Sequence, residues 1–362
     1  MNDQDKLEDF LDLLNRPAFA VRCGRIVCAN REALARLLPP GTEISTILVT
    51  GHEEYKTLGE GSLCLTLRVA GTHKEAAVRR MGDGVDLFLL DQETELTNLQ
   101  MLSLAAQKLR EPLNEIMTAT EQLLPELNLE ESPLLSKLAA SINRGSYQLL
   151  RMLGNMSDAG EYLHGAVPNR ERTSLTAFFG EIFQKAGELI EQAGYSFRAV
   201  LPEEDLTVGL DRQKMERATY NLLSNALRFS PKGSEIRAEV HVRRDLVLLQ
   251  VQDVGEGLLE AVQKTLFERY RREPAVEDRR FGIGLGLPMT RQVAAMHGGS
   301  LMVHLGKDGG TEAILSIDRK LPPAGSLYSP MMDVDYTGAR DHSLVELSGE
   351  LPLEMFQAWS LC

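Results

Sequence analysis

A polar row on one predicted helix carries the residue types that bind a metal-chelated phosphate chain. Apolar residues recur at helical spacing from Asp211 to Phe229, and Asp211 is the expected N-cap. On this helix Asn221, Asn225 and Arg228 fall on one face. Mg²⁺ takes oxygen ligands and few protein groups beside phosphate, and a guanidinium gives charge-assisted hydrogen bonds to phosphate. A solvated helix face is the alternative for this helix alone.

A second motif follows a predicted hairpin of alternating strands over residues 236–251. Asp253, Gly255 and Gly257 alternate directly after the second strand. A carboxylate at a strand end can accept a hydrogen bond from an adenine amino group, and the glycines let the backbone approach the ring. Phe229 could lie against the base. A plain Asp-x-Gly turn is the alternative for this motif taken alone.

A third motif is a set of alternating glycines, Gly282, Gly284 and Gly286, before a helical pattern over Pro288–His297. Glycines before a helix N-terminus make an anion site from backbone N–H groups and the helix dipole. The charge-rich stretch 258–281 separates this motif from the second one. A loop of this length is usually functional, and we expect a lid that orders over bound nucleotide.

In their order and spacing the three motifs resemble the N, G1 and G2 boxes of the ATP-binding domain shared by histidine kinases, gyrase-type ATPases, MutL-type proteins and large heat-shock chaperones. Residues 266–270 resemble the F box, and the match covers about 170–320. The resemblance implies an α/β-sandwich that binds ATP and Mg²⁺. By this resemblance Asn225 would hold Mg²⁺, Asn221 and Arg228 would help with the phosphates, and Asp253 would read adenine. The glycines would shape the pocket: Gly255, Gly257, Gly282, Gly284 and Gly286.

Two predicted helices with apolar seams occupy residues 96–165. The second helix restarts at Ser132-Pro133, which suits an N-cap followed by proline at the first helical position. One hairpin cannot bury both seams, so two chains would pair into a four-helix bundle. A plain coiled-coil dimeriser is the alternative. The seam positions are Leu102, Ala106, Leu109, Leu113, Ile116, Thr120, Leu123 and Leu127, then Leu135, Leu138, Ile142, Gly145, Leu149, Met152 and Met156.

This hairpin sits where histidine kinases carry a phosphoacceptor motif that reads roughly His-Glu-Leu-Arg-Thr-Pro-Leu. Residues 107–113 here read Gln-Lys-Leu-Arg-Glu-Pro-Leu. An acceptor needs a nitrogen lone pair, which imidazole offers near neutral pH. The amide nitrogen of Gln107 is delocalised and is no nucleophile. Lys108 replaces the acidic residue that would polarise the imidazole, and Glu111 replaces the residue that orients water in the phosphatase reaction. We therefore expect no phosphorylation at this position.

The length, net charge and composition of the chain limit the remaining classes of protein. The chain has 362 residues, and its net charge of −13 argues against nonspecific nucleic-acid binding. No apolar run is long enough for a membrane span, and the acidic N-terminus lacks the basic start of a signal peptide. The four cysteines show no zinc spacing. We expect a cytoplasmic protein.

The expected fold class is an α+β multidomain chain. Residues 1–95 alternate strands and short helices in an order that resembles a PAS-type sensor domain. The helical dimerisation hairpin takes 96–165, the ATP-binding domain 166–320, and a tail over 321–362 is expected to be disordered, with partner docking or self-docking as the alternative.

The predicted function is a dimeric, sensor-histidine-kinase-like two-component protein that binds Mg-ATP and acts as a pseudokinase-like regulator through a response regulator or a related partner. One alternative is an active kinase that phosphorylates a histidine on a partner in trans. Another is an ATP-driven clamp of the gyrase type. The absence of a transducer domain argues against the clamp.

Overall fold

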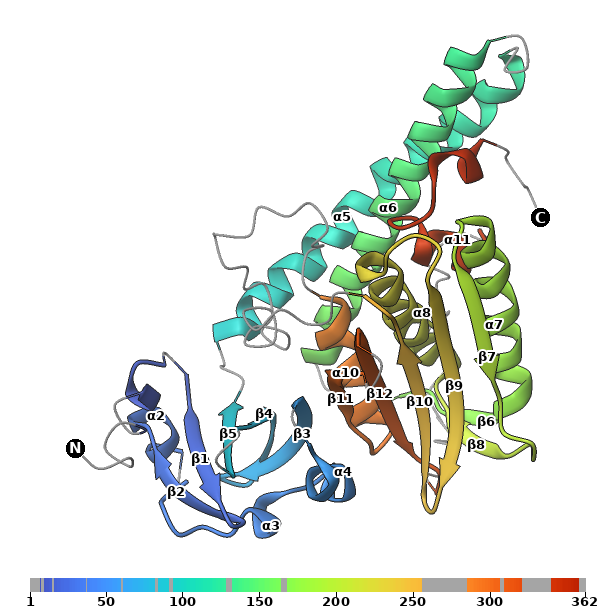
Figure 1. Ribbon diagram of the computed structural model, residues 1–362. Helices are drawn as coiled ribbons and strands as arrows, with labels where there is room; N and C mark the ends of the chain where they lie inside the picture. The colour runs from blue at the N-terminus through green and yellow to red at the C-terminus, as the bar shows by residue number, and fades with distance from the viewer. Residues whose placement is uncertain are drawn as a thin grey trace.

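The structure is a computed structural model, and three regions follow one another along the chain: an N-terminal sheet, two long helices and a larger α/β region (Figure 1). Within the described residues no helix is both long and apolar enough to cross a bilayer. The structure describes Leu7 and residues 10–14, 16–36, 38–59, 61–81, 84–90, 94–127, 132–163, 168–255, 285–306, 309–320 and 340–357.

The N-terminal region is an antiparallel sheet with the strand order β2-β1-β5-β4-β3. The turn Cys23-Gly24 joins β1 and β2 in a hairpin, and both turn residues have positive φ. The strands are β1 (Ala18–Arg22), β2 (Arg25–Ala29), β3 (Gly61–Val69), β4 (Thr72–Arg80) and β5 (Val85–Leu90), and the short helices between β2 and β3 are α2 (Arg31–Leu34), α3 (Ile44–Ile47) and α4 (His52–Thr57).

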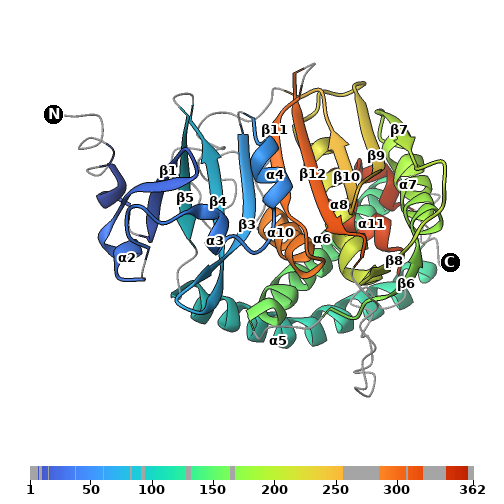
Figure 2. The same cartoon turned by 90° about the horizontal axis from the view of Figure 1, so that it is seen from below.

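Two long helices follow, α5 (Thr94–Leu123) with the 3₁₀ turn η1 (Leu124–Glu126), and α6 (Pro133–Leu163). The helices pack along each other (Figures 1 and 2). Each helix buries one side in the single chain: α5 buries Ala106 and Leu113 of its predicted seam, whereas α6 buries Leu150 and Leu153, which are not positions of its predicted seam. The other side is exposed, at Leu109, Ile116, Leu123, Leu138, Ile142 and Leu149.

The third region is a sheet covered on one face by helices (Figure 1). The predicted hairpin is β9 (Glu235–Arg243) and β10 (Leu246–Gln252), and β7 (Ser196–Val200) runs parallel to β9 at the edge. On the other side β10 pairs with β12 (Thr311–Asp318), which pairs with β11 (Leu301–Leu305). The covering helices are α7 (Leu175–Gln192), α8 (Arg212–Phe229) and α10 (Gly286–Met296), and β6 (Glu171–Ser174) pairs with β8 (Thr207–Leu210) in a separate two-stranded sheet.

A buried histidine ties the start of α8 to the end of α10. Asp211 is the N-cap of α8, as predicted, because its side chain accepts a hydrogen bond from the Lys214 amide. The backbone N–H of Asp211 donates to Nε2 of His297 at 3.0 Å, and Nδ1 of His297 lies 2.7 Å from the Val293 carbonyl oxygen. Burial lowers the pKa of His297, which favours the neutral ring that can make both contacts.

The first and third regions share one sheet, which the sequence did not predict. Strand β3 pairs with β11 through Leu301↔Cys64, Met302↔Leu63 and two further pairs, so that ten described strands run in a single order from β2 to β7 (Figure 2). Among the described residues, two ion pairs cross this junction. Arg291 of α10 faces Glu75 of β4 with only 3% and 16% of the side chains exposed, whereas Arg244 and Glu53 form an exposed pair at 3.4 Å.

The prediction of a disordered tail is wrong for residues 340–357. This stretch forms α11 (His342–Leu347) and the 3₁₀ turn η2 (Leu353–Phe356), and it packs on α6, α7 and α8 (Figure 1). Val345, Leu347, Leu351 and Phe356 are buried there. Burying these apolar side chains against the helices is more favourable in free energy than leaving them in water in a disordered tail.

We predict that Glu75→Gln loosens the junction between β3 and β11. The substitution removes the carboxylate that faces the buried Arg291, and loss of one partner of a buried pair costs roughly 3 kcal/mol. Native-state hydrogen exchange should show faster exchange of the β3 and β11 amides. The matched control is Glu53→Gln, which removes the exposed pair with Arg244 and should leave exchange unchanged. Equal exchange in both variants would contradict this account of the junction.

Candidate functional site

Helix α8 presents a buried polar row. Its apolar side packs into the core beneath the sheet, through residues such as Met215, Leu222 and Ala226. On the predicted polar face Asn221 is only 3% exposed, and Asn225 and Arg228 are half-buried. A solvated face would leave these side chains in water, so the alternative drawn from the sequence does not describe this helix.

The C-terminal end of α8 touches the second motif at very close range. A Cβ atom added at Gly255 would lie 2.3 Å from the Phe229 carbonyl oxygen, a distance that no side chain permits. Glycine at this position therefore lets the end of β10 lie directly against the end of α8. The contact brings Asp253 and Phe229, both candidates for the nucleotide base, to the same end of the sheet.

The Asp253 carboxylate is held in one orientation. It is 5% exposed, and its Oδ1 accepts hydrogen bonds from the backbone N–H groups of Gly255 at 2.8 Å and Thr311 at 3.0 Å. Burial raises the pKa of Asp253, and the two amides act in the opposite direction. A buried, oriented carboxylate at a strand end can accept a hydrogen bond from an amino group of a ligand.

The turn before β12 is part of this arrangement, although the sequence did not predict its contact with Asp253. Gly310 has φ +72°, and a Cβ atom there would lie 2.1 Å from the Asp253 carbonyl oxygen. Gly310 therefore allows the turn to approach closely enough for the Thr311 amide to reach the carboxylate. The available signal was the pair of glycines directly before a strand pattern.

The third motif reaches α8 through its last glycine. Gly286 is the first residue of α10, and a Cβ atom there would lie 3.3 Å from Oδ1 of Asn221. Gly257, Gly282 and Gly284 lie outside the described residues, as do the expected lid 258–281 and the F-box-like stretch 266–270. In the part of the chain that the structure describes, all three motifs therefore meet around α8.

These residues have the chemistry that ATP and Mg²⁺ require. Asn225 offers an amide oxygen, a hard ligand of the kind that Mg²⁺ accepts, half-buried one helical turn from Asn221. Gly255 and Gly286 keep side chains away from the two ends of the polar row. Asp253 supplies an oriented acceptor for a base, and Arg228 supplies a guanidinium on the face that carries the amides.

Two residues that contact the polar row, Arg151 and Glu350, could not be predicted from the sequence. Arg151 of α6 donates from Nη2 to Oδ1 of Asn221 at 3.4 Å. Arg228 donates from Nε and Nη2 to Oε1 of Glu350, at 2.8 and 2.6 Å, in the segment after α11. The site is therefore bordered by the long hairpin and by the C-terminal segment, which lie 70 and 122 residues away along the chain.

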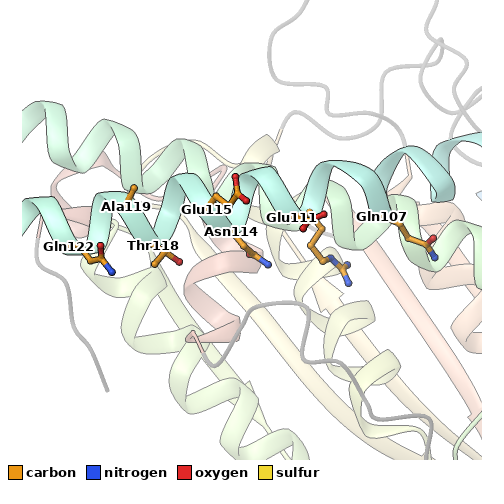
Figure 3. Close-up of a pocket in the computed structure, with 8 residues that line it drawn as sticks. Gln107, Glu111, Asn114, Glu115, Thr118, Ala119 and Gln122 are labelled. Carbon is orange, nitrogen blue, oxygen red and sulfur yellow. The ribbon is translucent and has the colours of Figure 1, made fainter.

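The acceptor-like position lies on a polar groove of α5. Gln107 and Glu111 are exposed, and with Asn114, Glu115 and Gln122 they line a groove of about 740 Å³ (Figure 3). Pro112 lies within the uninterrupted helix α5. The groove presents amide, carboxylate, hydroxyl and guanidinium groups, and none of its lining residues is a histidine. At this position the helix offers oxygen acceptors and amide donors but no imidazole.

Comparison with known proteins agrees with the geometry of the site. Residues 210–321 match the family described as histidine kinase-, DNA gyrase B-, and HSP90-like ATPase. The adaptive-response sensory kinase SasA of a Synechococcus strain is 28% identical over 317 residues, which cover 82% of each chain. Histidine protein kinase DivJ of Caulobacter vibrioides is 28% identical over 62% of this chain and 38% of its own length. Sensor protein KdpD of Clostridium acetobutylicum is 26% identical over 63% of this chain.

The chain spans only a part of several of these relatives, such as 25% of the length of that KdpD protein. Among solved structures, the catalytic domain of histidine kinase ThkA aligns with a TM-score of 0.37 and 21% identity, over 41% of this chain and 95% of its own. Full-length ShkA in complex with AMPPNP aligns with a TM-score of 0.48 and 17% identity, over 62% of this chain and 47% of its own. The sequence matches, together with the three motifs that meet around α8, show that this chain contains an ATP-binding domain of the histidine-kinase family.

Proposed function

We propose that this protein is a histidine-kinase-like signalling regulator that binds Mg-ATP and lacks its own phosphoacceptor. The observation that carries the proposal is that Asp253, Gly255 and Gly286 meet around the C-terminal half of α8, which carries Asn221. Asn225 is the protein ligand of Mg²⁺, Asn221 and Arg228 face the phosphates, and Asp253 accepts a hydrogen bond from the adenine amino group. Gly257, Gly282 and Gly284 complete the pocket.

The pseudokinase part of the proposal depends on the chemistry of α5. Gln107 is exposed at the acceptor-like position and has no lone pair that can attack a phosphorus atom. Lys108 and Glu111 also differ from the family motif. Bound nucleotide would then act by favouring one packing of the helices over another, because a ligand with different affinities for two states shifts their populations.

A second function keeps the enzyme active toward another protein. The site around α8 does not depend on Gln107, and phosphoryl transfer is mostly positioning and electrostatics. A histidine on a partner, or on a different subunit in a mixed dimer, could receive the phosphoryl group in trans. The exposed polar groove of α5 leaves room for such a partner, and a response regulator is the partner that the family implies.

The proposed domain division keeps a sensor at 1–95, a dimerisation hairpin at 96–165 and the ATP-binding domain at 166–320. The strand order β2-β1-β5-β4-β3, with α2, α3 and α4 between β2 and β3, supports a PAS-like sensor. The half-exposed seams of α5 and α6 support pairing of two chains, since a second hairpin would bury them.

Asn225→Ala should weaken Mg-ATP binding by more than about tenfold, the effect of losing about 1.4 kcal/mol. The variant removes the oxygen ligand proposed for Mg²⁺, so the difference from the wild type should vanish when EDTA removes the metal. Isothermal titration calorimetry would measure both affinities. Gln213→Ala, on the first turn of the same helix, is the matched control and should bind as the wild type does. Equal affinity of Asn225→Ala and wild type would reject the metal assignment.

Gln107→His should restore autophosphorylation. With γ-labelled ATP we expect no acid-labile label on the wild-type chain and clear label on the variant, because the imidazole supplies the missing nucleophile. Gln107→Asn is the control, since it keeps an amide and should stay unlabelled. Label on the wild-type chain would show that another residue accepts the phosphoryl group. Label on a partner protein mixed with the wild type would favour the active kinase over the pseudokinase.

Ile116→Glu combined with Ile142→Glu should convert a dimer into a monomer. Both side chains are about half exposed in the single chain, at 58% and 46%, and a carboxylate in a dimer seam would be desolvated without a partner. Sedimentation equilibrium should give twice the monomer mass for the wild type and one monomer mass for the variant. Gln122→Glu adds a charge on the polar groove and should remain dimeric. A monomeric wild type would contradict the proposed bundle.

A further inference from the structure

The C-terminal segment 340–357 is a packed element on the outer side of α8 (Figure 1). Phe356 is 1% exposed and makes an edge contact with Tyr147 of α6, with ring centroids 5.8 Å apart. Asn143 of α6 donates from Nδ2 to the Phe356 carbonyl oxygen at 3.1 Å. The apolar contacts give the segment one defined position, so the polar groups that it presents to α8 are held in place.

The segment is acidic, and it packs against arginines of α6 and α8. It carries four carboxylates, at Asp341, Glu346, Glu350 and Glu354, against the single cation Arg340. Two of these carboxylates face arginines of α6 and α8. Such charge complementarity favours one docking position over others.

Glu346 anchors the segment between two arginines. Its side chain is fully buried, with Nε of Arg217 at 3.2 Å and Nε of Arg151 at 3.3 Å. Arg151 also donates to Oδ1 of Asn221. The Arg151 guanidinium therefore contacts both Glu346 and Asn221, a member of the polar row of α8.

Glu350 lies closer to the proposed phosphate position. Two N–H groups of the Arg228 guanidinium converge on its Oε1, and the two side chains are only 18% and 13% exposed. Gly349 precedes Glu350 in the chain. A Cβ atom at Gly349 would lie 3.5 Å from Nη1 of Arg151 and 3.9 Å from Nη2 of Arg228. The backbone can thus approach both arginines. An arginine fork uses the same donors for a carboxylate and for a phosphate.

We propose that residues 340–357 are an autoinhibitory acidic cap, in which Glu350 occupies Arg228 in place of a nucleotide phosphate. The inference rests on the proposed function, because it requires that Arg228 binds the phosphates of ATP. One guanidinium cannot give the same two N–H groups to both acids. A phosphate that takes these two N–H groups displaces Glu350, so binding of the triphosphate and docking of the cap oppose each other. By linkage, each weakens the other by the same factor.

The test compares the nucleotide affinity of the full-length wild type with that of Glu350→Gln, using calorimetry with Mg-ATP and with adenosine. We expect the variant to bind Mg-ATP roughly five- to tenfold more tightly, at the lower end of typical coupling between sites. Adenosine has no phosphate, so its affinity should not change. Glu354→Gln is the matched control: it removes the same charge from an exposed position of the same segment and should leave both affinities unchanged.

A second measurement does not depend on any variant. Hydrogen exchange of wild-type peptides within 341–357 should become faster at saturating Mg-ATP and stay the same with adenosine. Equal Mg-ATP affinity of Glu350→Gln and wild type, or unchanged exchange in the bound wild type, would overturn the cap and leave nucleotide binding intact. Tighter binding of adenosine as well would also overturn competition at the phosphates. Failure of the wild type and both variants to bind Mg-ATP would overturn the proposed function together with the cap.

Discussion

The carbonyl oxygen of Phe229 and the α-carbon of Gly255 lie so close that no side chain fits between them, and the geometry of the site depends on this contact. It fixes the end of α8 against the end of β10. Asp253 is then close enough for the Gly255 amide to orient its carboxylate, and the Thr311 amide completes the arrangement from the neighbouring strand. A helix whose apolar side is buried against the sheet can turn its amides in only one direction, toward the start of α10.

The regions of the chain meet the ATP-binding domain at separate surfaces. The N-terminal sheet joins its edge through β3 and β11, the long hairpin reaches Asn221 through Arg151, and the C-terminal segment reaches Arg228 through Glu350. A change in any of these regions therefore has a short physical path to the polar row of α8. Backbone hydrogen bonds make the first contact the stiffest. Arg151 and Arg228, in contrast, can each exchange their present partner for an anion.

The proposed loss of the acceptor and the proposed cap would act on different steps. The first removes a nucleophile, so no bound nucleotide can label the usual position. The second concerns occupancy of the pocket, because Glu350 holds a guanidinium that a phosphate would need. A regulator that signals by nucleotide binding needs control over occupancy more than it needs chemistry, and both features fit that requirement.

The sequence by itself determined the local features. Helical spacing put Asn221, Asn225 and Arg228 on one face. Asp211 and Ser174 cap the helices that follow them. The absence of an imidazole at position 107 depends on residue identity alone. It did not predict β4, whose polar outward residues hide the alternation, nor the ordered segment 340–357. Only the tertiary structure decided which partner Arg228 has and which strand lies beside β11. Those contacts join residues more than a hundred positions apart, and neither periodicity nor capping carries information over that separation.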